Sequence, residues 1–275
     1  MISLKNVSFG YNSDSIILNN ISLNIEHGKI YSIIGRTGSG KSTLMRHFNG
    51  LLKPTSGQVL VDGEDINAKG VNLKQVRSKI GLVFQFPEQQ LFAETVFDDI
   101  AFGAQNLGLP KEEVFERVYD AAKAVSLSDD MLKKSPFALS GGEKRRAAIA
   151  GVLAMKPQTL VLDEPSAGLD GAARKDLYSL INSFRAQSPD NSVVFVSHSM
   201  DEVAALADYI YVLAHGEIVL EGTPEKVFEN KNLLDDLGVG LPFISELAHK
   251  LKEHSIDIGN VYTIEQAVEG ILKFC

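Results

Sequence analysis

The stretch GRTGSGKST, residues 35–43, constrains this chain more than any other feature of its sequence. It matches the pattern G-x-x-x-x-G-K-S/T, and it stands between a continuous β-branched run, KIYSIIG, and a helical pattern that begins near Ser42. Its glycines permit a tight loop whose backbone N–H groups point inward at phosphate oxygens, and the N-terminus of the helix adds positive charge. A simple glycine-rich turn is the alternative. The flanking strand and helix favour a nucleotide-binding loop.

Side chains of the same loop have separate expected roles. Lys41 can reach the β- and γ-phosphates, and the Ser42 hydroxyl can bind Mg²⁺. ATP and Mg²⁺ are therefore the expected cofactors. The residues expected to surround ATP are Gly35, Thr37, Gly38, Ser39, Gly40, Lys41, Ser42 and Thr43.

Two further strand ends carry polar residues. Asp163 and Glu164 follow the apolar run TLVL, and His198 ends the run SVVFVSH. The carboxyl ends of parallel strands form the mouth of a sheet, where the phosphates should lie. Asp163 is then a Mg²⁺ ligand, Glu164 can orient or deprotonate a water in line with the γ-phosphate, and His198 can contact that phosphate. An acidic pair after a strand can instead be a solvated loop or a helix cap, but the phosphate loop upstream favours catalysis.

Strand and helix patterns alternate along the chain. Residues 1–28 alternate in polarity, as half-buried antiparallel strands do, and a hairpin is expected to turn at His215–Gly216. Continuous apolar runs, typical of strands buried on both faces, occupy 29–35, 159–164 and 192–198. Helical patterns cover 42–52, 111–125, 143–155 and 172–186. The alternation predicts a parallel sheet with flanking helices. The expected fold class is α/β, a P-loop ATPase with a mixed central sheet and an N-terminal antiparallel β part.

The helical parts divide the chain further. Residues 86–155 contain no obvious long strand and are expected to form a helical insertion. After about residue 230 come two amphipathic helical patterns, and the second begins with Thr263 and Gln266 at capping-box spacing. We therefore expect an ATPase domain over 1–230 and a C-terminal helical extension over 231–275.

Composition restricts the class of partner. A formal net charge of −8 argues against a nucleic acid held through its phosphates. The single cysteine, Cys275, leaves no disulfide within the chain, which fits a reducing compartment. The start, MISLKNVSFGY, does not resemble a signal peptide, and the apolar run AAIAGVLAM is far shorter than the roughly 18 to 20 residues of a membrane span. We expect a soluble chain whose membrane role comes through a partner.

A second anion-binding feature lies in LSGGEKRR, residues 139–146. Ser140, Gly141 and Gly142 immediately precede a helical pattern, so they predict another helix terminus suited to phosphate. One triphosphate hardly needs two such cradles in one chain. A dimer resolves the excess, because the phosphate loop of each protomer can hold ATP against the Ser-Gly-Gly of the other.

Taken together, these motifs resemble those of ABC transporter ATPase subunits. The phosphate loop, Gln85 after a strand, LSGGE, LVLDEP, SAGLD and VSH occur in the order of that family, over about residues 1–230. The resemblance implies that Tyr11 stacks on adenine, that Gln85 binds Mg²⁺ and the attacking water, and that Glu164 is the catalytic base. Tyr11 can alternatively be a loop aromatic in ordinary packing.

The same resemblance assigns roles across the dimer. Asp170 is implied to link the two sites, and His198 to hold the γ-phosphate. The residues implied to contact the ATP of the partner are Ser140, Gly141, Gly142 and Glu143. Two positions depart from the usual pattern. Glu143 replaces a glutamine, and its carboxylate is less favourable near triphosphate unless it points away, while Gly171 stands where proline is common. Neither change removes a group needed for hydrolysis.

The stretch FPEQQLF, residues 86–92, resembles the version found in energy-coupling factor transporters, which import vitamins and metal ions. With RTGSGKST and the C-terminal helices, it looks most like the second ATPase of their pair. The implied partners are a second ABC ATPase subunit, a polytopic membrane coupling subunit and a substrate-binding membrane subunit, at the cytoplasmic face of the cell membrane. The implied docking residues are Phe86, Glu88, Leu91 and Phe92, and Glu88 can meet a basic residue of the docked helix. The aromatic rings, Phe92 above all, can alternatively pack within the insertion.

The C-terminal helices allow two interpretations as well. Their apolar residues can seal a small core of their own, or they can hold two ATPases together between turnovers, and a mixture is expected. These residues are Phe243, Leu247, Leu251, Val268 and Leu272.

Other classes of protein explain less. A soluble ABC machine acting on ribosomes or DNA would carry two ATPase units, long coiled coils or zinc-finger cysteines. A P-loop kinase or GTPase gives LSGGE no role, and the guanine-selecting pattern N-K-x-D fails at Leu233. Within transport, the alternative is a homodimeric ATPase dedicated to one cobalt or nickel importer, because another subunit selects the substrate.

Overall fold

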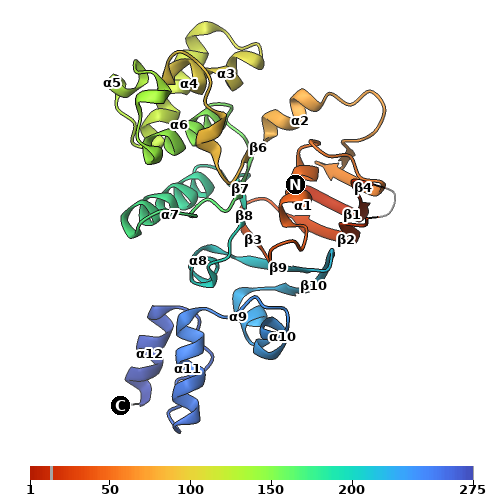
Figure 1. Ribbon diagram of the computed structural model, residues 1–275, viewed down its shortest axis with the longest axis vertical. Coiled ribbons are helices and arrows are strands. Elements are labelled where there is room, and N and C mark those ends of the chain that lie inside the picture. The colour runs from red at the N-terminus through yellow and green to blue at the C-terminus, as the bar shows by residue number, and fades with distance from the viewer. Residues whose placement is uncertain (13–14, 275) are drawn as a thin grey trace.

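The computed structural model describes residues 1–12 and 15–274, so Cys275 lies outside the described residues. Its centre is a six-stranded sheet of order β10-β9-β3-β8-β7-β6, in which β10 runs antiparallel to β9 and the other neighbours are parallel (Figure 1). Every residue of β3, β7 and β8 is buried, as the continuous apolar runs predict. The strands are β3 (Ile30–Ile34), β6 (Ile80–Val83), β7 (Thr159–Asp163), β8 (Ser192–Val196), β9 (Tyr209–Ala214) and β10 (Glu217–Gly222).

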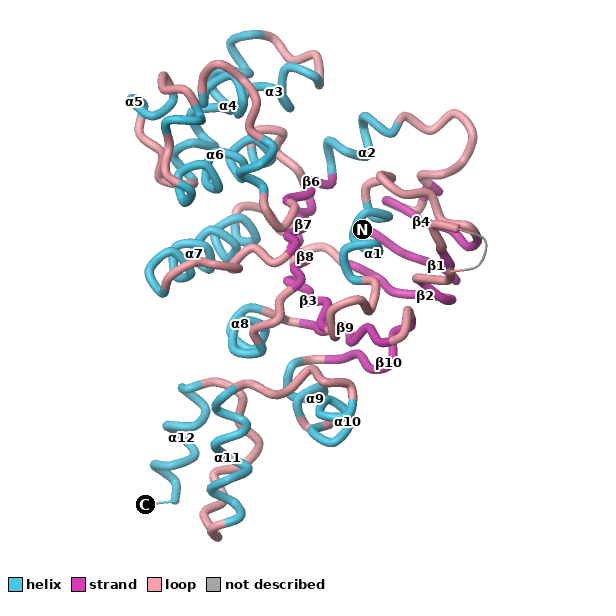
Figure 2. Tube along the Cα trace, viewed as in Figure 1, coloured by secondary structure: helices cyan, strands magenta, loops and turns pink. Residues whose placement is uncertain are grey.

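The alternating N-terminal residues form a second, antiparallel sheet of order β2-β1-β4-β5. Helix α1 (Lys41–Phe48) packs its apolar side chains into the core that this sheet shares with the central sheet. Figure 2 shows α1 between the two sets of strands. The sheet consists of β1 (Ile2–Phe9), β2 (Leu18–Ile25), β4 (Ser56–Val61) and β5 (Glu64–Asp65), and α2 (Leu73–Lys79) leads from it to β6.

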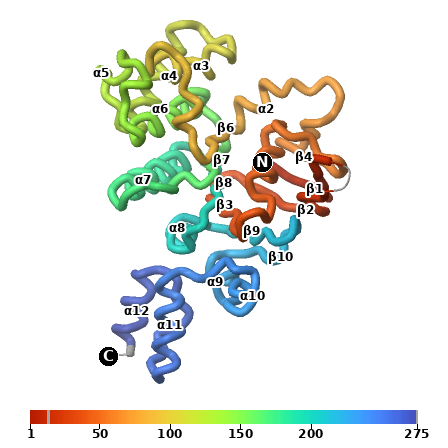
Figure 3. Tube along the Cα trace, in the orientation of Figure 1, coloured from red at the N-terminus to blue at the C-terminus, as the bar shows by residue number. Residues whose placement is uncertain are grey.

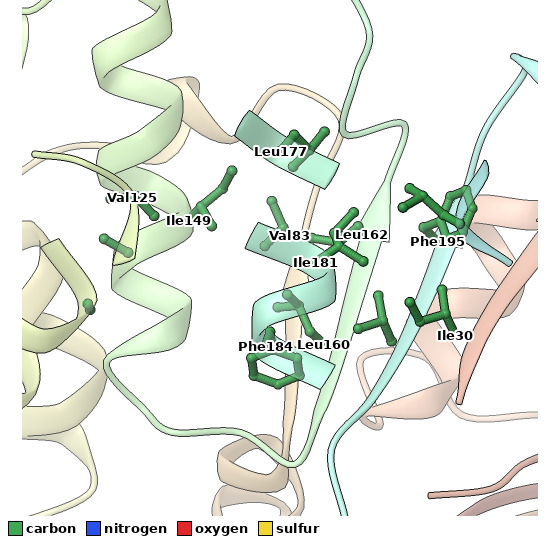
Figure 4. Packing of buried hydrophobic residues seen from close by; sticks show 14 of the residues in the cluster. Ile30, Val83, Val125, Ile149, Leu160, Leu162, Leu177, Ile181, Phe184 and Phe195 are labelled. Atoms are coloured by element: carbon green, nitrogen blue, oxygen red, sulfur yellow. The ribbon is translucent and has the colours of Figure 1, made fainter. Parts of the chain in front are cut away.

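Helices cover the opposite face of the central sheet. Side chains of α7, including Leu177 and Ile181, lie over Leu160 and Leu162 of β7, and Ile149 reaches the same core from the helical insertion (Figure 4). No described residue between β6 and β7 belongs to a strand, which agrees with the predicted insertion. The elements are η1 (Pro87–Gln90), α3 (Val96–Asn106), α4 (Lys111–Ala124), α5 (Asp129–Leu132), η2 (Pro136–Ala138), α6 (Gly141–Leu153), α7 (Gly171–Ala186) and α8 (Met200–Leu206).

The last helices lie at one end of the molecule (Figure 3). The last two of them share a small core of their own, formed by Ala248, Ile258, Val261 and Ala267. The two before them contribute Val227, Phe228 and Leu234 to the main core. The predicted capping box is present, since Gln266 N–H donates to Thr263 Oγ1 at 3.3 Å and Thr263 N–H to Gln266 Oε1 at 3.3 Å. The helices are α9 (Pro224–Phe228), α10 (Lys231–Asp236), α11 (Phe243–Glu253) and α12 (Ile264–Phe274).

Two helix ends differ from the predicted ones for local reasons. Helix α1 stops at Phe48 rather than near Leu52, because Gly50 adopts a left-handed φ of 68° that ends a helix. Helix α6 begins at Gly141 rather than Glu143, because Ser140 is its N-cap. Within 1–12 and 15–274, no helix combines the length and the apolar character that crossing a membrane requires.

Candidate active site

The loop of residues 35–40 joins β3 to α1, and its shape depends on glycine. Gly35, Gly38 and Gly40 have φ values of 150°, 85° and 106°. A Cβ on Gly35 would lie 2.1 Å from the carbonyl oxygen of Leu213, so no side chain fits there. The left-handed conformations and this close approach explain the glycine pattern on which the prediction of a phosphate loop rests.

Inside this loop lies the ammonium group of Lys41. It donates to the carbonyl oxygens of Gly35 at 2.7 Å and Arg36 at 3.0 Å. Burial lowers the pKa of Lys41, while the carboxylates of Glu164 and Asp163 act in the opposite direction. The hydroxyl of Ser39 is buried without a hydrogen-bond partner. A buried cation and an unpaired donor in one loop fit the oxygens of a phosphate.

The other residues predicted to surround ATP lie around this cation. Thr37 and Gly38 are exposed, whereas Ser42 and Thr43 are half-buried in the first turn of α1. The structure therefore brings together every predicted residue of the loop, with its exposed rim at Thr37 and Gly38.

The Mg²⁺ prediction concerns Ser42, Gln85 and Asp163. Asp163 is buried at the carboxyl end of β7, and its Oδ1 has no hydrogen-bond partner. Burial raises the pKa of Asp163, the hydrogen bond from Ser42 opposes the rise, and the charge of Glu164 adds to it. A buried, unpaired carboxylate oxygen beside a hydroxyl fits Mg²⁺, which uses one or two carboxylates together with phosphate oxygens. In the described part of the chain, no cluster of three or more His, Cys, Asp or Glu side chains forms a metal cage.

Three predicted catalytic residues, from separate segments, meet at Glu164. Gln85 Nε2 donates to Glu164 Oε2 at 2.7 Å, and His198 Nε2 lies 3.0 Å from Glu164 Oε1. Glu164 itself has a left-handed φ of 48°, which is unusual for a residue with a side chain, and its N–H is tied to the carbonyl of Val196 at 3.1 Å. Strained backbone of this kind is concentrated at functional sites.

The signature segment, LSGGE at residues 139–143, leads into the start of α6, within the helical insertion (Figure 1). Ser140 and Glu143 make a capping box, in which the N–H and the hydroxyl of Ser140 each lie 2.7 Å from Glu143 Oε2. These bonds from Ser140 lower the pKa of Glu143. Ser140, Gly141 and Gly142 are exposed. The carboxylate of Glu143 therefore caps its own helix, and it also occupies the hydroxyl that the resemblance assigns to the partner's ATP.

Tyr11 and Asp170 are both exposed at the surface. Tyr11 is 55% exposed, and its one aromatic contact among the described residues is a T-shaped contact with Phe9, at a centroid distance of 5.0 Å. Asp170 caps α7, where its Oδ1 accepts from Ala173 N–H at 2.8 Å. Both side chains are accessible to a ligand or a partner, and their predicted roles stay predictions.

The residues predicted to dock a membrane subunit divide into two groups. Phe86 and Phe92 are 49% and 61% exposed, although the Phe92 ring also packs edge-on against Phe102 at 5.0 Å. Leu91 packs against the main core instead. The carboxylate of Glu88 already faces a basic residue of its own chain, since Arg145 Nε lies 3.7 Å from Glu88 Oε2. Its contact with a docked helix stays a prediction.

A groove of about 620 Å³ lies beside Phe92 and Phe102, and residues of the helical insertion and of the α2–β6 region line it. Its lining includes Leu91, Phe92, Asp99, Phe102, Ala148 and Met155. Asp99 Oδ1 accepts from the N–H groups of Phe92 and Ala93 at 3.0 and 3.1 Å, while its buried Oδ2 has no partner. The groove thus combines apolar side chains with the cationic residues Lys74 and Arg77, and the unpaired carboxylate oxygen lies buried beside it.

Sequence reasoning missed three buried charged residues near the site, Asp99, Arg145 and Glu202. Glu202 is fully buried and accepts from the hydroxyls of Ser166 at 2.7 Å and Ser197 at 2.5 Å. Ser199 and Glu202 have capping-box spacing, so the sequence signals a surface cap there rather than a buried carboxylate. No local pattern identifies Arg145, because its partners are distant in sequence, and none identifies Asp99, whose partners are backbone N–H groups six and seven residues away.

Comparison with known proteins agrees with this geometry. A family model described as "ABC transporter" matches residues 18–167. The energy-coupling factor transporter ATP-binding protein EcfA2 of Caldanaerobacter subterraneus subsp. tengcongensis is 47% identical over 99% of this chain and 97% of its own length. That of Streptococcus thermophilus is 47% identical over 98% of this chain and 99% of its own length.

Solved structures show the same fold. CbiO1 from Clostridium perfringens, described as part of the ABC transporter complex cbiONQ, has a TM-score of 0.76 and 36% identity, covering 90% of this chain and 97% of its own. The ATP-binding cassette MJ0796, in a dimeric post-hydrolysis state with ADP and Pi, has a TM-score of 0.73 and 30% identity, covering 82% of this chain and 99% of its own. The predicted α/β ABC fold is confirmed, and with it the predicted resemblance to the second energy-coupling factor ATPase. This chain belongs to the ABC transporter ATPase family, among the ATP-binding proteins of energy-coupling factor transporters.

Proposed function

We propose that this ABC ATPase binds and hydrolyses ATP to energise an energy-coupling factor importer for vitamins or other micronutrients. The observation that carries the proposal is the meeting of Gln85 and His198 at Glu164, beside the phosphate loop. The near full-length identity to EcfA2 proteins supports the kind of importer.

The proposed chemistry follows from this arrangement. Lys41 and the loop N–H groups bind the phosphates. Ser42, Gln85 and Asp163 would hold Mg²⁺, which would supply positive charge to neutralise the phosphate oxygens. Glu164 accepts a proton from the water that attacks the γ-phosphorus, and ADP leaves as its bond to that phosphorus breaks. His198 donates to a γ-phosphate oxygen once ATP is bound.

We further propose that two ATPase subunits form the working unit. Ser140, Gly141 and Gly142 are exposed at a helix N-terminus, which suits the triphosphate of a second subunit. Asp170 lies exposed at the start of α7 and links the two sites. The dimeric state of the related MJ0796 cassette supports this assembly.

The proposed attachment to the membrane is the groove described above, with Phe86 and Phe92 at the cytoplasmic face of the cell membrane. A helix of the coupling subunit places an apolar side chain against these rings, where burying one phenylalanine contributes roughly 1.5–3 kcal/mol. A separate membrane subunit binds the transported substrate.

A second candidate is a homodimeric ATPase dedicated to one cobalt or nickel importer. The likeness to CbiO1, part of the cbiONQ complex, favours this alternative. The two candidates differ in what accompanies the chain. A shared importer requires a second ATPase and several interchangeable substrate-binding proteins, whereas a dedicated importer requires one fixed membrane complex.

The test is purification of the tagged chain from its native cells in mild detergent, followed by mass spectrometry of the attached proteins. A second ATPase, a polytopic membrane protein and several small membrane proteins support the proposal. One fixed membrane complex without a second ATPase favours the dedicated importer. Recovery of no membrane protein contradicts both. A parallel purification of Phe86→Ala/Phe92→Ala should lose the membrane proteins while binding ATP as before.

A further inference from the structure

Arg145 lies where four functional segments meet. It belongs to α6, whose first turn carries the signature, and its side chain is only 10% exposed. Its Nη1 donates to the carbonyl of Ala167 at 2.7 Å, and its Nη2 donates to the carbonyl of Gln85 at 3.0 Å. Its Nε lies 3.7 Å from Glu88 Oε2. One side chain thus joins the signature helix, the 166–170 loop, Gln85 and the docking segment.

These contacts use the particular geometry of a guanidinium group. Its nitrogens are fixed in one plane, so it can bridge two carbonyl oxygens at once, and a lysine ammonium cannot span both in the same way. Glu88 Oε2 is buried and has no hydrogen-bond partner, so it supplies the opposing charge through proximity to Arg145. Buried charge without such compensation is costly, which ties the position of Glu88 to that of Arg145.

The path to the reacting atoms is short. Arg145 holds the backbone of Gln85, and the side chain of Gln85 donates to Glu164 at 2.7 Å. On its other side, Arg145 holds Ala167, whose N–H donates to the carbonyl of Glu164 at 3.2 Å. A displacement of Arg145 would therefore shift Glu164 through both Gln85 and Ala167. A displacement of Glu88 would act on Glu164 by moving Arg145.

We propose that Arg145 is a positioning residue that couples a partner docked at residues 86–92 to ATP hydrolysis at Glu164. The coupling part of this inference rests on the proposed docking function. Arg145 fixes the positions of Gln85 and the 166–170 loop relative to the signature helix. A docked helix that moves Glu88 shifts these positions and so changes the rate of hydrolysis.

The test compares Arg145→Lys with Arg117→Lys in the full chain, alone and in its purified membrane complex. Arg117 is a matched control in the same insertion, since it is 15% exposed, pairs with Glu113 and donates to the carbonyl of Met155 at 3.1 Å. Among the described residues it has no hydrogen bond or ion pair to any of the four segments. Melting temperature, KM for ATP and kcat are measured for each variant.

We expect Arg145→Lys to lower kcat about tenfold or more with a KM for ATP within about twofold of the unmodified chain. Its melting temperature should fall no further than that of Arg117→Lys, which should keep its kcat. Parallel losses of kcat and melting temperature in the two variants would show that Arg145 only holds the insertion in place, and the proposal would be wrong.

The second arm tests the connection to the docking segment. Assembly with the membrane subunit is expected to change kcat, and Glu88→Gln should make that change smaller. In a chain that already carries Arg145→Lys, adding Glu88→Gln should not alter the change in kcat any further. Independent effects of the two substitutions contradict coupling through this pair. If the unmodified chain recovers no membrane subunit, the docking function itself fails, and the kcat comparison with Arg117→Lys still decides whether Arg145 positions Gln85.

Discussion

At the scale of single residues, Glu164 is the side chain on which the proposed hydrolysis depends. Glu164→Gln keeps the shape of the side chain and can still bond to Gln85, but an amide cannot accept a proton from water. We expect kcat to fall by about 10² to 10⁴, the usual range for a general base, with ATP binding retained. Phosphate release and nucleotide binding measure the two effects.

The same variant should also accumulate as an ATP-bound dimer, visible by size-exclusion chromatography in the presence of ATP. Glu225→Gln, an exposed glutamate at the start of α9, is the control that should change neither activity nor assembly. Undiminished phosphate release from Glu164→Gln would show that another group removes the proton.

A second prediction concerns Glu143. Its carboxylate accepts from both the N–H and the hydroxyl of Ser140, so it competes with phosphate for these donors and adds negative charge beside it. Glu143→Gln should tighten ATP-dependent association with the second ATPase by roughly two- to fivefold, the size of one exposed charge interaction. The gain should shrink as salt is raised, because exposed charges are screened. Equal association at low salt would mean that Glu143 turns away when ATP binds.

The arrangement of Glu143 also shows what a local pattern leaves undecided. Ser140 and Glu143 have the spacing of a capping box and, at the same positions, the spacing of a signature that contacts nucleotide. The spacing is compatible with both roles, and only the structure shows which bonds form within the chain. The phosphate loop was easier to predict, because positive φ values and the close approach at Gly35 require the glycines that the pattern contains.

At the scale of elements, the strands were the most predictable part. In the run TLVLD, three consecutive apolar side chains lie between Thr159 and Asp163, as expected of a strand that is buried on both faces, and all five residues of β7 are buried. Helix ends and long-range pairs were less predictable. The end of α1 depends on a single left-handed glycine, and the partners of Arg145 lie 22 and 60 residues away in sequence. The periodicity of the sequence carries no information about contacts between residues that are so far apart.

Helix α1 gives a prediction about pH. His47 is fully buried, and its Nε2 has no hydrogen-bond partner. Burial lowers the pKa of His47, and the hydrogen bond to the carbonyl of Thr43 opposes this only in part. The unfolded chain therefore binds a proton at higher pH than the folded chain does. The contribution of neutral His47 to the stability of the folded chain is fully present above the unfolded pKa of about 6.5. It falls as the pH decreases toward the pKa of His47 in the folded chain.

We expect the melting temperature to fall between pH 7.5 and pH 5.5, and His47→Phe to reduce that fall by roughly 2–4 °C. Phenylalanine fills a similar volume next to Phe9 without a titrating group. His254→Gln, which changes an exposed histidine, should leave the pH dependence as it is. An unchanged slope in His47→Phe would show that other groups dominate in this pH range. Scanning calorimetry at both pH values provides the measurement.

At the scale of the whole molecule, we propose a division into the ATPase domain, residues 1–230, and a helical extension, residues 231–275. The extension has its own small core, and α12 approaches it closely, since a Cβ on Gly270 would lie 2.4 Å from the carbonyl oxygen of Ile258. Leu251 packs against this core, as expected of a residue that seals it. Phe243 and Leu272 do not seal it, because they are 64% and 71% exposed.

The exposed residues on α12 give the last prediction. Ile264, Val268, Ile271 and Leu272 follow the i, i+4, i+7 and i+8 spacing of one helix face, and all are at least 42% exposed. Such a stripe is suited to pairing with the second ATPase subunit. Val268→Ser/Leu272→Ser should therefore reduce recovery of that subunit in the absence of ATP, with ATP affinity unchanged.

The two substitutions should leave the fold intact, because neither side chain belongs to the core that Ala267 and Val261 form. Glu265→Ser/Glu269→Ser alters the same helix at polar positions and serves as the control. Adding ATP should partly restore recovery in the apolar variant, since the signature then provides a second contact between the subunits. Full recovery without ATP would show that the α12 stripe contributes nothing to pairing, and that the subunits associate through their nucleotide sites alone.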